Sequence, residues 1–503
     1  MSLLAIDMGS SSCKAVVFSV DGRALSYKTH VYKPESLHPG WAEMQPENFW
    51  NAFRSVTRAV AAEVADPVEV LAISSHGETF IPVDSQGRPV ANAILNLDQR
   101  AIKQTRWLAE NIGRKRTFQI TGLPIHTMYP LPKILWLRDN QREVFESTSC
   151  FLALPTYLLA RLGLPRHVDH SLASRFFTFD IHKQRWSDEI LSKCGLDPKL
   201  FPTTVAAGTV AGELNSSVAS DLGLLPKTKV VVGGHDQPCG ALGCGVINAG
   251  RVSASLGTYE CLVAASETPA VNDQALAANL NSYCHVVPNR FVNLVFFPAG
   301  VMLEWFVGLV HPERRTSAAD LFAELEASVP PGPTGILVTP HLPGTCNPDF
   351  DSHASGVIAG IRPSTSASDL YKAILEGIAG EFAAMTELLQ KAVGSLHDVY
   401  VTGGGTRSRL GLSLRASLAN VSLHLMRSDE AVCLGTAMLA GVGAGKYRNF
   451  DEAVQQLVVT RETIDPTPGC AARYRQQLDQ YRLLYSALAP IRKAQAMSSQ
   501  GES

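Results

Sequence analysis

A carboxylate followed at once by glycine and hydroxyl side chains stands near the start of the chain, in the segment Asp7-Met-Gly9-Ser10-Ser11-Ser12. Glycine lets the backbone come close to a phosphate, consecutive backbone N–H groups can form an anion nest, and the serine hydroxyls add donors. The Asp7 carboxylate could hold Mg²⁺, directly or through water, since this hard ion prefers oxygen ligands. The same residues also suit an Asx-type hairpin turn, and the segment alone does not separate the two interpretations.

Two more turns have a related composition. The first, Ser255-Leu-Gly257-Thr258, lies between two apolar segments, and the second, Gly403-Gly404-Gly405, follows the apolar segment VYVT and precedes a helical pattern. Two serine- and glycine-bearing turns in matching places could hold a polyphosphate from both sides, and the N-terminus of the helix could face an anion or a nucleotide. Taken alone, the triple glycine is more typical of a tight strand-to-helix bend.

Asp236 is the candidate general base. The β-branched segment KVVVGG (229–234) predicts a strand that opens onto His235-Asp236-Gln237-Pro238 and then a helix of small residues. Phosphoryl transfer to a hydroxyl needs a carboxylate that orients the hydroxyl and accepts its proton. An acidic residue followed closely by proline is also typical of a helix start, so Asp236 could instead be a helix cap. We assign His235 no role in proton transfer.

Strands and helices must position these residues. The segments LLAID, KAVVFSV and RALSYKTHVY predict three strands within the first 32 residues, with the Asp-Gly pair at 21–22 as a hairpin turn. A helix is expected over about 46–65, with Pro46 and Glu47 in its first turn, and VEVLAISS (68–75) predicts another strand. The segment RVSASLGTYECLVAA (251–265) repeats the strand–turn–strand arrangement, so both halves of the chain open in the same way.

The elements predict an α/β protein of more than one domain. A chain of 503 residues is too long for one ordinary core. We expect a first domain over 1–246, a second over 247–490, and a disordered tail over 491–503, which is small and polar.

Composition and missing motifs exclude several classes of protein. The net charge is −2 and no Lys/Arg cluster is present, so a nucleic-acid partner is not expected. We find no signal peptide, and the apolar stretch at 292–303 is too short for a membrane span. Ten scattered cysteines without a CxxC pair predict free thiols and a cytoplasmic location.

Two nucleotide-binding motifs are also absent. No GxGxxG follows the first strand, which argues against an NAD-dependent enzyme. The segment GVGAGKY (441–447) lacks the spacing of a Walker loop and predicts a turn at the end of a helix.

Taken in order, these segments resemble the FGGY family of carbohydrate kinases, within the actin-like, ribonuclease-H-like ATPase superfamily. The resemblance runs from residue 7 to about 445 and is specific through the order and spacing of its parts, which are DMGSSSCKAVVFSVDG (7–22), HPGWAEMQPENFW (38–50), HGETFIPVDSQGRPVANAILNLDQR (76–100), GGHDQPCGALG (233–243), SLGTYE (255–260), and GGGTRS with CLGTAMLAGVGAG (403–445). It implies two ribonuclease-H-like domains, each an α/β sheet flanked by helices, with ATP and sugar in the cleft between them.

The resemblance also implies roles by position. Asp236 would be the general base, Asp7 would organise Mg²⁺ with Asp236 beside it, and Lys14 stands where related glycerol kinases have an arginine near the transferred phosphate. The implied ATP contacts are Gly9, Ser10, Ser11, Ser12, Lys14, Gly257, Thr258, Gly404, Gly405 and Ser408. The implied sugar contacts are His76, Gly77, Glu78, Asp98, Arg100 and Gln237.

Three departures concern the sugar pocket. Asn96 stands where many relatives carry a tryptophan, Ser75 where xylulose kinases have methionine, and Gly77 where glycerol kinases have arginine. The pocket therefore resembles no single subfamily, and the sequence leaves open whether Asn96 and Gly77 change the substrate class.

We therefore expect ATP- and Mg²⁺-dependent phosphorylation of a hydroxyl of a small sugar or polyol, with a ketopentose such as xylulose or ribulose first. Glycerol, erythritol and gluconate remain open as acceptors. A non-sugar actin-like ATPase is disfavoured by the polar segment 76–100, and a catalytically silent binding protein by Asp7, Asp236 and the Ser/Gly turns. The sequence does not give the oligomeric state, although homodimers are the commonest outcome.

Overall fold

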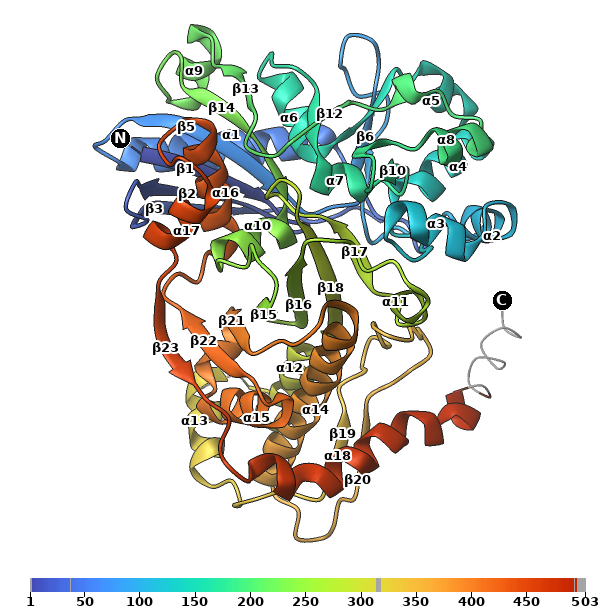
Figure 1. Ribbon diagram of the computed structural model, residues 1–503, viewed down its shortest axis with the longest axis vertical. Helices are drawn as coiled ribbons and strands as arrows, with labels where there is room; N and C mark the ends of the chain where they lie inside the picture. Colours follow the sequence, from blue (N-terminus) through green and yellow to red (C-terminus); the bar gives the residue numbers. More distant parts are fainter. Residues whose placement is uncertain (1, 37, 314–317, 493, 495–503) are drawn as a thin grey trace.

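The computed structural model describes residues 2–36, 38–313, 318–492 and 494. Figure 1 shows two lobes stacked along the long axis of the molecule, each built on a mixed β-sheet with helices against it. This arrangement confirms the predicted two-domain α/β fold.

The first sheet has the strand order β13-β14-β5-β1-β2-β3. In its centre β1 pairs antiparallel with β2 and parallel with β5, and β5 pairs parallel with β14. The bounds are β1 (Ser2–Met8), β2 (Ser12–Ser19), β3 (Ala24–Val31), β5 (Val68–Ser75), β13 (Val210–Glu213) and β14 (Lys229–His235).

Both faces of this sheet are covered, because the apolar residues of β1 alternate between two cores. Leu4 and Ile6 pack in the cluster that contains the aromatic residues of α1 (Pro46–Glu63). Leu3 and Ala5 pack on the other face against α16 (Ala431–Gly443). Successive side chains of a strand point to opposite faces, so a run of apolar residues such as LLAI fits a strand that is buried on both sides.

The second sheet repeats this topology. In the order β17-β18-β16-β15-β21-β22-β23, β15 pairs antiparallel with β16 and parallel with β21, and β21 pairs parallel with β22. The predicted architectural repeat between the two halves is therefore confirmed. The bounds are β15 (Arg251–Leu256), β16 (Tyr259–Ser266), β17 (Asn281–Cys284), β18 (Phe291–Pro298), β21 (Asp398–Thr402), β22 (Ser422–Met426) and β23 (Thr460–Ile464).

Helices and short strands surround the two sheets. In the first lobe these are β4 (Glu43–Met44), β6 (Phe80–Val83), β7 (Ala93–Ile94), α2 (Ile102–Asn111), α3 (Arg114–Thr121), α4 (Pro130–Asn140), α5 (Arg142–Ser147), β8 (Cys150–Ala153), α6 (Leu154–Arg161), β9 (His167–Asp169), α7 (His170–Ser174), β10 (Phe179–Asp180), β11 (Arg185–Trp186), α8 (Asp188–Cys194), η1 (Pro198–Leu200), β12 (Thr203–Val205), α9 (Ser216–Leu222) and α10 (Asp236–Gly243). In the remainder of the chain they are α11 (Asp273–Ala277), α12 (Gly300–Val310), α13 (Ala318–Ala327), β19 (Leu337–Thr339), β20 (Val357–Ala359), α14 (Ala367–Val393), η2 (Gly404–Arg407), α15 (Arg409–Ala419), α17 (Phe450–Leu457) and α18 (Cys470–Ala487).

The chain returns to the first lobe after building most of the second. Helix α16 packs on β1, β5 and β14, and residues of α17 belong to the same apolar cluster (Figure 1). Helix α16 crosses α10 so closely that a Cβ on Gly243 would lie 1.9 Å from the carbonyl oxygen of Ala431. The predicted boundary at 246 falls in the connection between α10 and β15, whereas residues 431–457, counted within the second predicted domain, cover the first sheet.

Several local predictions can be compared directly. Helix α1 starts at Pro46, as predicted, and residues 441–447 form the end of α16 and the turn after it. The ten cysteines are free thiols, and among the described helices we find none long and apolar enough to cross a bilayer. The predicted disordered tail lies outside the described residues except for 491, 492 and 494.

Candidate active site

The carboxyl ends of three parallel strands form one edge of the site. In the register of the first sheet, Asp7 on β1 pairs with Ser74 on β5, and Ser75 pairs with His235 at the end of β14. Because these strands run in the same direction, the residues that follow them meet at the same edge. Three predicted site residues, Asp7, His76 and Asp236, are brought together in this way.

Asp236 is the first residue of α10 and not its cap. The N-cap position is His235, and no side-chain capping bond is present there. The Asp236 side chain is 19% exposed, its Oδ1 lies 3.2 Å from His235 Nε2, and this oxygen has no hydrogen-bond partner within the described structure. Burial raises the pKa of Asp236 well above its usual value, and the charges of Asp7 and Glu78 raise it further.

Asp7 is a second buried carboxylate at this edge. It accepts a hydrogen bond of 2.9 Å from Ser74 Oγ. Burial raises the pKa of Asp7, while the Ser74 bond and the Lys14 charge oppose the rise. Two carboxylates that repel each other in a buried place suit a divalent cation, and the described residues offer no cluster of three or more His, Cys, Asp or Glu that would cage one. This donor set fits Mg²⁺, which keeps several waters and shares substrate oxygens.

The turn at residues 9–12 follows Asp7 directly. Gly9 N–H donates to the carbonyl of Ser12 at 2.8 Å, and Tyr32 Oη donates to the carbonyl of Gly9. Ser10, Ser11 and Ser12 remain partly or fully exposed. Lys14, on β2, pairs across the sheet with Asp7 and donates to Glu430 at the start of α16.

Three predicted sugar contacts, residues 76–78, follow β5 at this edge. His76 is buried, with Nδ1 2.8 Å from the carbonyl of Met8 and Nε2 2.6 Å from Thr79 Oγ1. Gly77 leaves little room for a side chain, because a Cβ would lie 3.0 Å from side-chain atoms of both Arg175 and His235. Glu78 has a positive φ of 63°, and a buried ion pair of 2.5 Å with Arg175 holds it there.

The other predicted sugar contacts lie in a different environment. Asp98 is fully buried and accepts from the backbone N–H of Ala42 at 2.7 Å and from Arg100. Arg100 also pairs with Glu43 and lies 3.7 Å above the ring of Trp41. A sugar could bind Asp98 only by replacing one of these bonds. The remaining predicted contact, Gln237, is partly exposed beside Asp236.

The second lobe contains a pocket of about 700 Å³. Five of the predicted ATP contacts line it, namely Gly257, Thr258, Gly404, Gly405 and Ser408. They meet because β15 and β21 are parallel neighbours, with Ser255 opposite Thr402, so the turns that follow them share an edge. Gly403 supports this turn with a φ of 93°, and a Cβ there would lie 2.7 Å from the carbonyl oxygen of Leu256. The volume is that of a small-molecule site.

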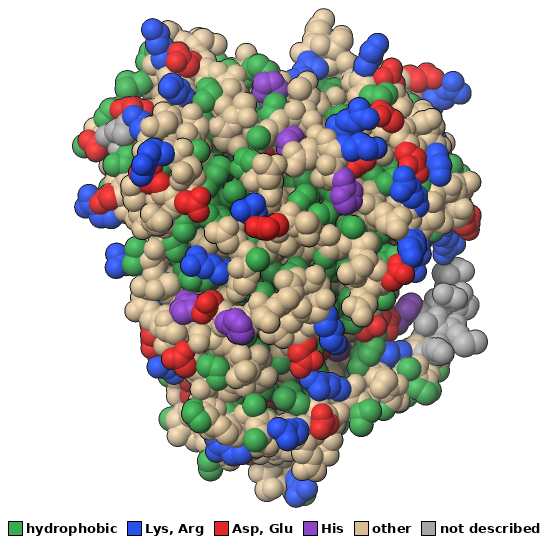
Figure 2. Space-filling view, in the orientation of Figure 1, with side chains coloured by type: hydrophobic (Ala, Val, Ile, Leu, Met, Phe, Trp, Pro, Cys, Tyr) green, Lys and Arg blue, Asp and Glu red, His purple; other side chains and the backbone are tan. Residues whose placement is uncertain are grey.

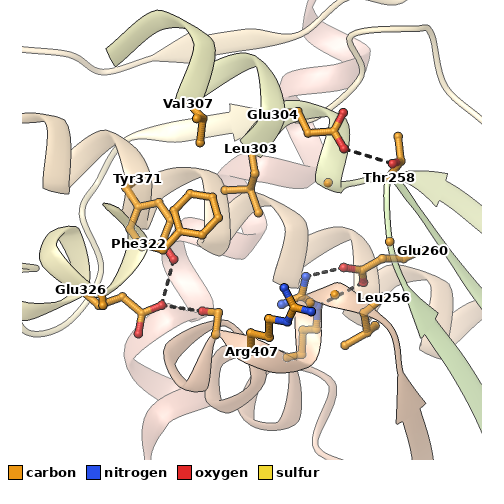
Figure 3. Close-up of a pocket in the computed structure, with 17 residues that line it drawn as sticks. Leu256, Thr258, Glu260, Leu303, Glu304, Val307, Phe322, Glu326, Tyr371 and Arg407 are labelled. Carbon is orange, nitrogen blue, oxygen red and sulfur yellow. Dashed lines mark hydrogen bonds and ion pairs between the residues drawn. The ribbon is translucent and has the colours of Figure 1, made fainter. Parts of the chain in front are cut away.

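The walls of the pocket are apolar and its ends are polar (Figure 3). Phe322 stacks on Tyr371, with ring centroids 5.1 Å apart. Glu326 Oε1 accepts hydrogen bonds from Tyr371 Oη at 2.8 Å and from Ser408 Oγ at 2.7 Å. At the other end Thr258 Oγ1 donates to Glu304 at 3.2 Å. The pocket therefore offers apolar surfaces for a flat ring and hydrogen-bonding groups at its ends.

The pocket and the first-sheet edge are neighbours. Cys261 lies on β16, three residues after Thr258, and its thiol is close enough to Asp236 for the charge of that carboxylate to raise the pKa of the thiol, in addition to the larger effect of burial. Helix α10, which begins with Asp236, also contacts β15 and β16, the strands on either side of the 257–258 turn.

Comparison with known proteins identifies the family. A model of the N-terminal domain of the FGGY family of carbohydrate kinases matches residues 2–243, and a model of the C-terminal domain of the same family matches residues 252–444. The chain belongs to the FGGY family.

Relatives of this FGGY kinase match it over almost the whole chain. It is 27% identical to a xylulose kinase of Bacillus subtilis over 488 residues, which are 96% of each chain. It is 24% identical to a gluconokinase of the same organism, over 94% of this chain and 93% of the relative. The solved structure of a xylulose kinase from Rhodospirillum rubrum superposes with a TM-score of 0.89 at 23% identity, covering 98% of this chain and 100% of the other.

A network around Glu78 of this FGGY kinase was not predicted from the sequence. Arg175 lies between the rings of Tyr129 and Tyr283, at 5.2 and 4.7 Å, and donates to Asn281 Oδ1 at 3.1 Å. Tyr129 Oη donates to the same oxygen at 2.8 Å, and Tyr283 Oη is 2.9 Å from His235 Nδ1. Asn281 and Tyr283 are on β17, in the second sheet, so both lobes contribute to the surroundings of the predicted sugar contact Glu78. No motif surrounds these residues in the sequence.

Proposed function

We propose that this FGGY kinase transfers the γ-phosphoryl group of ATP to a hydroxyl of a neutral ketopentose, xylulose or ribulose. The observation that carries the proposal is the free oxygen of Asp236, held at the edge of the first sheet beside the strand that follows the 257–258 turn. A general base must lie within hydrogen-bond reach of the hydroxyl that it deprotonates, and the Asp236 side chain is partly exposed and has an oxygen without a hydrogen-bond partner.

In this proposal, each lobe binds one of the two reactants. The nucleoside of ATP binds in the pocket of the second lobe, with its base against Phe322 and Leu303. The phosphates extend past Gly257 and Thr258 toward the turn at 9–12. The sugar lies beside His76, Glu78 and Gln237, so that its hydroxyl reaches Asp236.

In the chemical step, the acceptor oxygen forms a bond to the γ-phosphorus while the bond between this phosphorus and the β–γ bridging oxygen breaks. The hydroxyl proton passes to the carboxylate of Asp236, and ADP leaves. The raised pKa of Asp236 makes it a stronger base than an exposed aspartate. Asp7 and Asp236 would hold Mg²⁺, which neutralises charge on the transferring group when it is bound.

The charges on the sugar side favour a neutral acceptor over an aldonate. Arg175 is committed to Glu78, and Lys133 donates to the backbone carbonyls of Leu95 and Met128 at 2.5 and 2.7 Å. An aldonate would bring its carboxylate close to Glu78 and Asp236 without gaining either cation. Gluconate, the substrate that one relative is named for, is therefore the second candidate.

A coupled assay of ADP release tests the proposal. The acceptors are D-xylulose, D-ribulose, glycerol, erythritol and gluconate, each with and without Mg²⁺, and the control enzyme is Asp236→Asn. We expect Mg²⁺-dependent release that is highest with a ketopentose and lost in the control. Release that needs no acceptor would support an actin-like ATPase instead, and preference for gluconate would overturn the assignment to a neutral sugar.

A further inference from the structure

An ion pair joins the turn at 9–14 to the returning helix α16. Lys14 Nζ donates to Glu430 Oε2 at 2.5 Å, and the two side chains are 30% and 31% exposed. Lys14 stands opposite Asp7 on the neighbouring strand. The ammonium of Lys14, two residues after the predicted phosphate turn, is thus paired with a carboxylate from a residue 416 positions later in the chain.

Glu430 is not needed there to cap its helix. It is the N-cap residue of α16, but its side chain makes no capping hydrogen bond and points to Lys14 instead. The negative charge of Glu430 also disfavours the charged form of Asp7, because Glu430 raises the pKa of Asp7 whereas Lys14 lowers it. A carboxylate placed beside another carboxylate, in a site that must receive phosphate, needs a functional explanation.

We propose that Glu430 is a positioning residue that holds Lys14 while the phosphate site is empty and yields it to the terminal phosphate of ATP. This inference rests on the proposed function. Carboxylate and phosphate are alternative partners for one ammonium, because both offer anionic oxygens for the same charge-assisted bond. The terminal phosphate must therefore compete with Glu430, whereas ADP, which lacks that group, leaves the pair intact.

The exchange has a consequence for release of the product. After transfer, the phosphate belongs to the sugar and still lies near Lys14. The ion pair between Glu430 and Lys14 can then form again, and this weakens the binding of the phosphorylated sugar. The ion pair thus lowers the affinity for ATP, and it also favours release of the phosphorylated sugar from the site.

Calorimetric titration with ATP and with ADP, in the absence of sugar, tests the exchange. In Glu430→Gln we expect the dissociation constant of ATP to fall about three- to fivefold, the upper part of the range for loss of an ion pair near the surface. The constant for ADP should stay within about twofold of the wild-type value. In Lys14→Met, ATP should bind more weakly, and adding Glu430→Gln to that variant should give no gain.

Glu69→Gln is the matched control. Glu69 pairs with Lys446 at 3.3 Å just beyond the other end of α16, and its partner is 29% exposed, much like Lys14. This variant removes the same charge and should leave both nucleotide affinities unchanged. Thermal unfolding of each variant, with Glu430→Ala as a second replacement, separates an effect on folding from one on binding.

Three results would overturn the inference. They are ATP affinity in Glu430→Gln that is equal to or weaker than wild type, an equal gain for ADP, and a gain that persists without Lys14. Failure of the proposed function would look different, since the wild-type enzyme would then phosphorylate none of the acceptors whatever the outcome of the titrations.

Discussion

The Asp236 carboxylate is largely buried and has one oxygen without a hydrogen-bond partner, and the expected role of this residue follows from these two properties. A buried polar atom without a partner is costly, so its retention points to a partner that arrives with the substrate. The same atom would be satisfied if Asp236 were only a helix cap, which the structure shows it is not.

Asp236→Asn should lower kcat by about 10²- to 10⁴-fold, the usual contribution of a positioned base. The amide has nearly the same shape but cannot accept the hydroxyl proton. ATP affinity, measured by titration, should stay within about twofold of wild type because the pocket proposed for the nucleoside is in the other lobe. Wild-type turnover in this variant would remove Asp236 from its assigned role.

Lys133 makes the free energy of unfolding depend on pH. Complete burial lowers the pKa of Lys133 to about 7, although the charges of Asp98 and Glu78 oppose the shift. The unfolded chain has the ordinary pKa of 10.5, so between pH 7 and 10.5 it binds more protons than the folded chain, and this term makes the fold more stable as pH rises. The gain is at most about 1.4 kcal/mol per pH unit.

Lys133→Met removes this term. The difference in unfolding temperature between wild type and Lys133→Met should therefore shift in favour of wild type on going from pH 7 to pH 9.5. Parallel profiles of the two proteins over that range would contradict the assignment. Other groups titrate in both proteins, so their contributions to stability cancel in the difference between the two unfolding temperatures.

At the residue scale, the sequence predicted the parts of the site that depend on local chemistry. Glycine and hydroxyl residues in a turn are visible in a few positions, and Gly257, Thr258, Gly404 and Gly405 do line one pocket. Arg175, Asn281 and Glu326 were missed because each acts through a partner between 45 and 106 residues away. A single charged or amide residue within a helix or strand carries no sign of such a partner.

At the scale of elements, the crossing of α10 and α16 depends on glycine. A Cβ on Gly243 would meet the backbone of Ala431, and one on Gly435 would lie 1.9 Å from the carbonyl oxygen of Cys239. Backbone atoms cannot move aside as a flexible side chain can. The two helices therefore approach each other only because both positions lack a side chain.

Gly435→Ala should destabilise the protein by at least about 1–3 kcal/mol through overpacking, measured as a lower midpoint of urea unfolding. The control is Gly308→Ala in α12, where a Cβ would meet nothing within 4 Å. That variant should be neutral or slightly stabilising, since alanine is the better helix former. Equal midpoints for the two variants would show that the crossing tolerates a side chain.

The boundaries of many elements were predicted correctly, but the position of α16 was not foreseen. Alternation and turn residues define strands such as β1, β2 and β5, and Pro46 marks the start of α1. Helix α16 is apolar around almost its whole circumference, because it is enclosed between α10 and the first sheet. A helix without a polar face gives no indication of which sheet it covers.

At the scale of the whole molecule, the two lobes are joined by polar contacts as well as by the chain. Asn281 on the second sheet accepts from Tyr129 and Arg175 of the first lobe. On the face shown in Figure 2, Lys and Arg are interspersed with Asp and Glu over both lobes and form no single basic patch. The homodimer and the cytoplasmic location stay predictions.

Asn281→Leu should raise the KM for the sugar about tenfold or more and leave the KM for ATP within about twofold. The change removes the acceptor that Tyr129 Oη and Arg175 Nη1 share, a loss that typically costs about 1–3 kcal/mol, and it leaves Glu78 as the acceptor of Arg175, so that the support of Glu78 loosens. Steady-state kinetics with each substrate varied in turn give both constants. An equal rise in both KM values would mean that Asn281 affects how closely the two lobes approach each other and not the binding of the sugar.

The return of α16 and α17 to the first sheet also bears on how the protein is made. A growing chain that has reached residue 246 has all the strands of the first sheet, but the face with Leu3 and Ala5 still lacks its cover. Domains ordinarily fold as units while synthesis proceeds from the N-terminus. Here the first lobe lacks the cover of one apolar face until residues 431–457 have been synthesised and have left the ribosome.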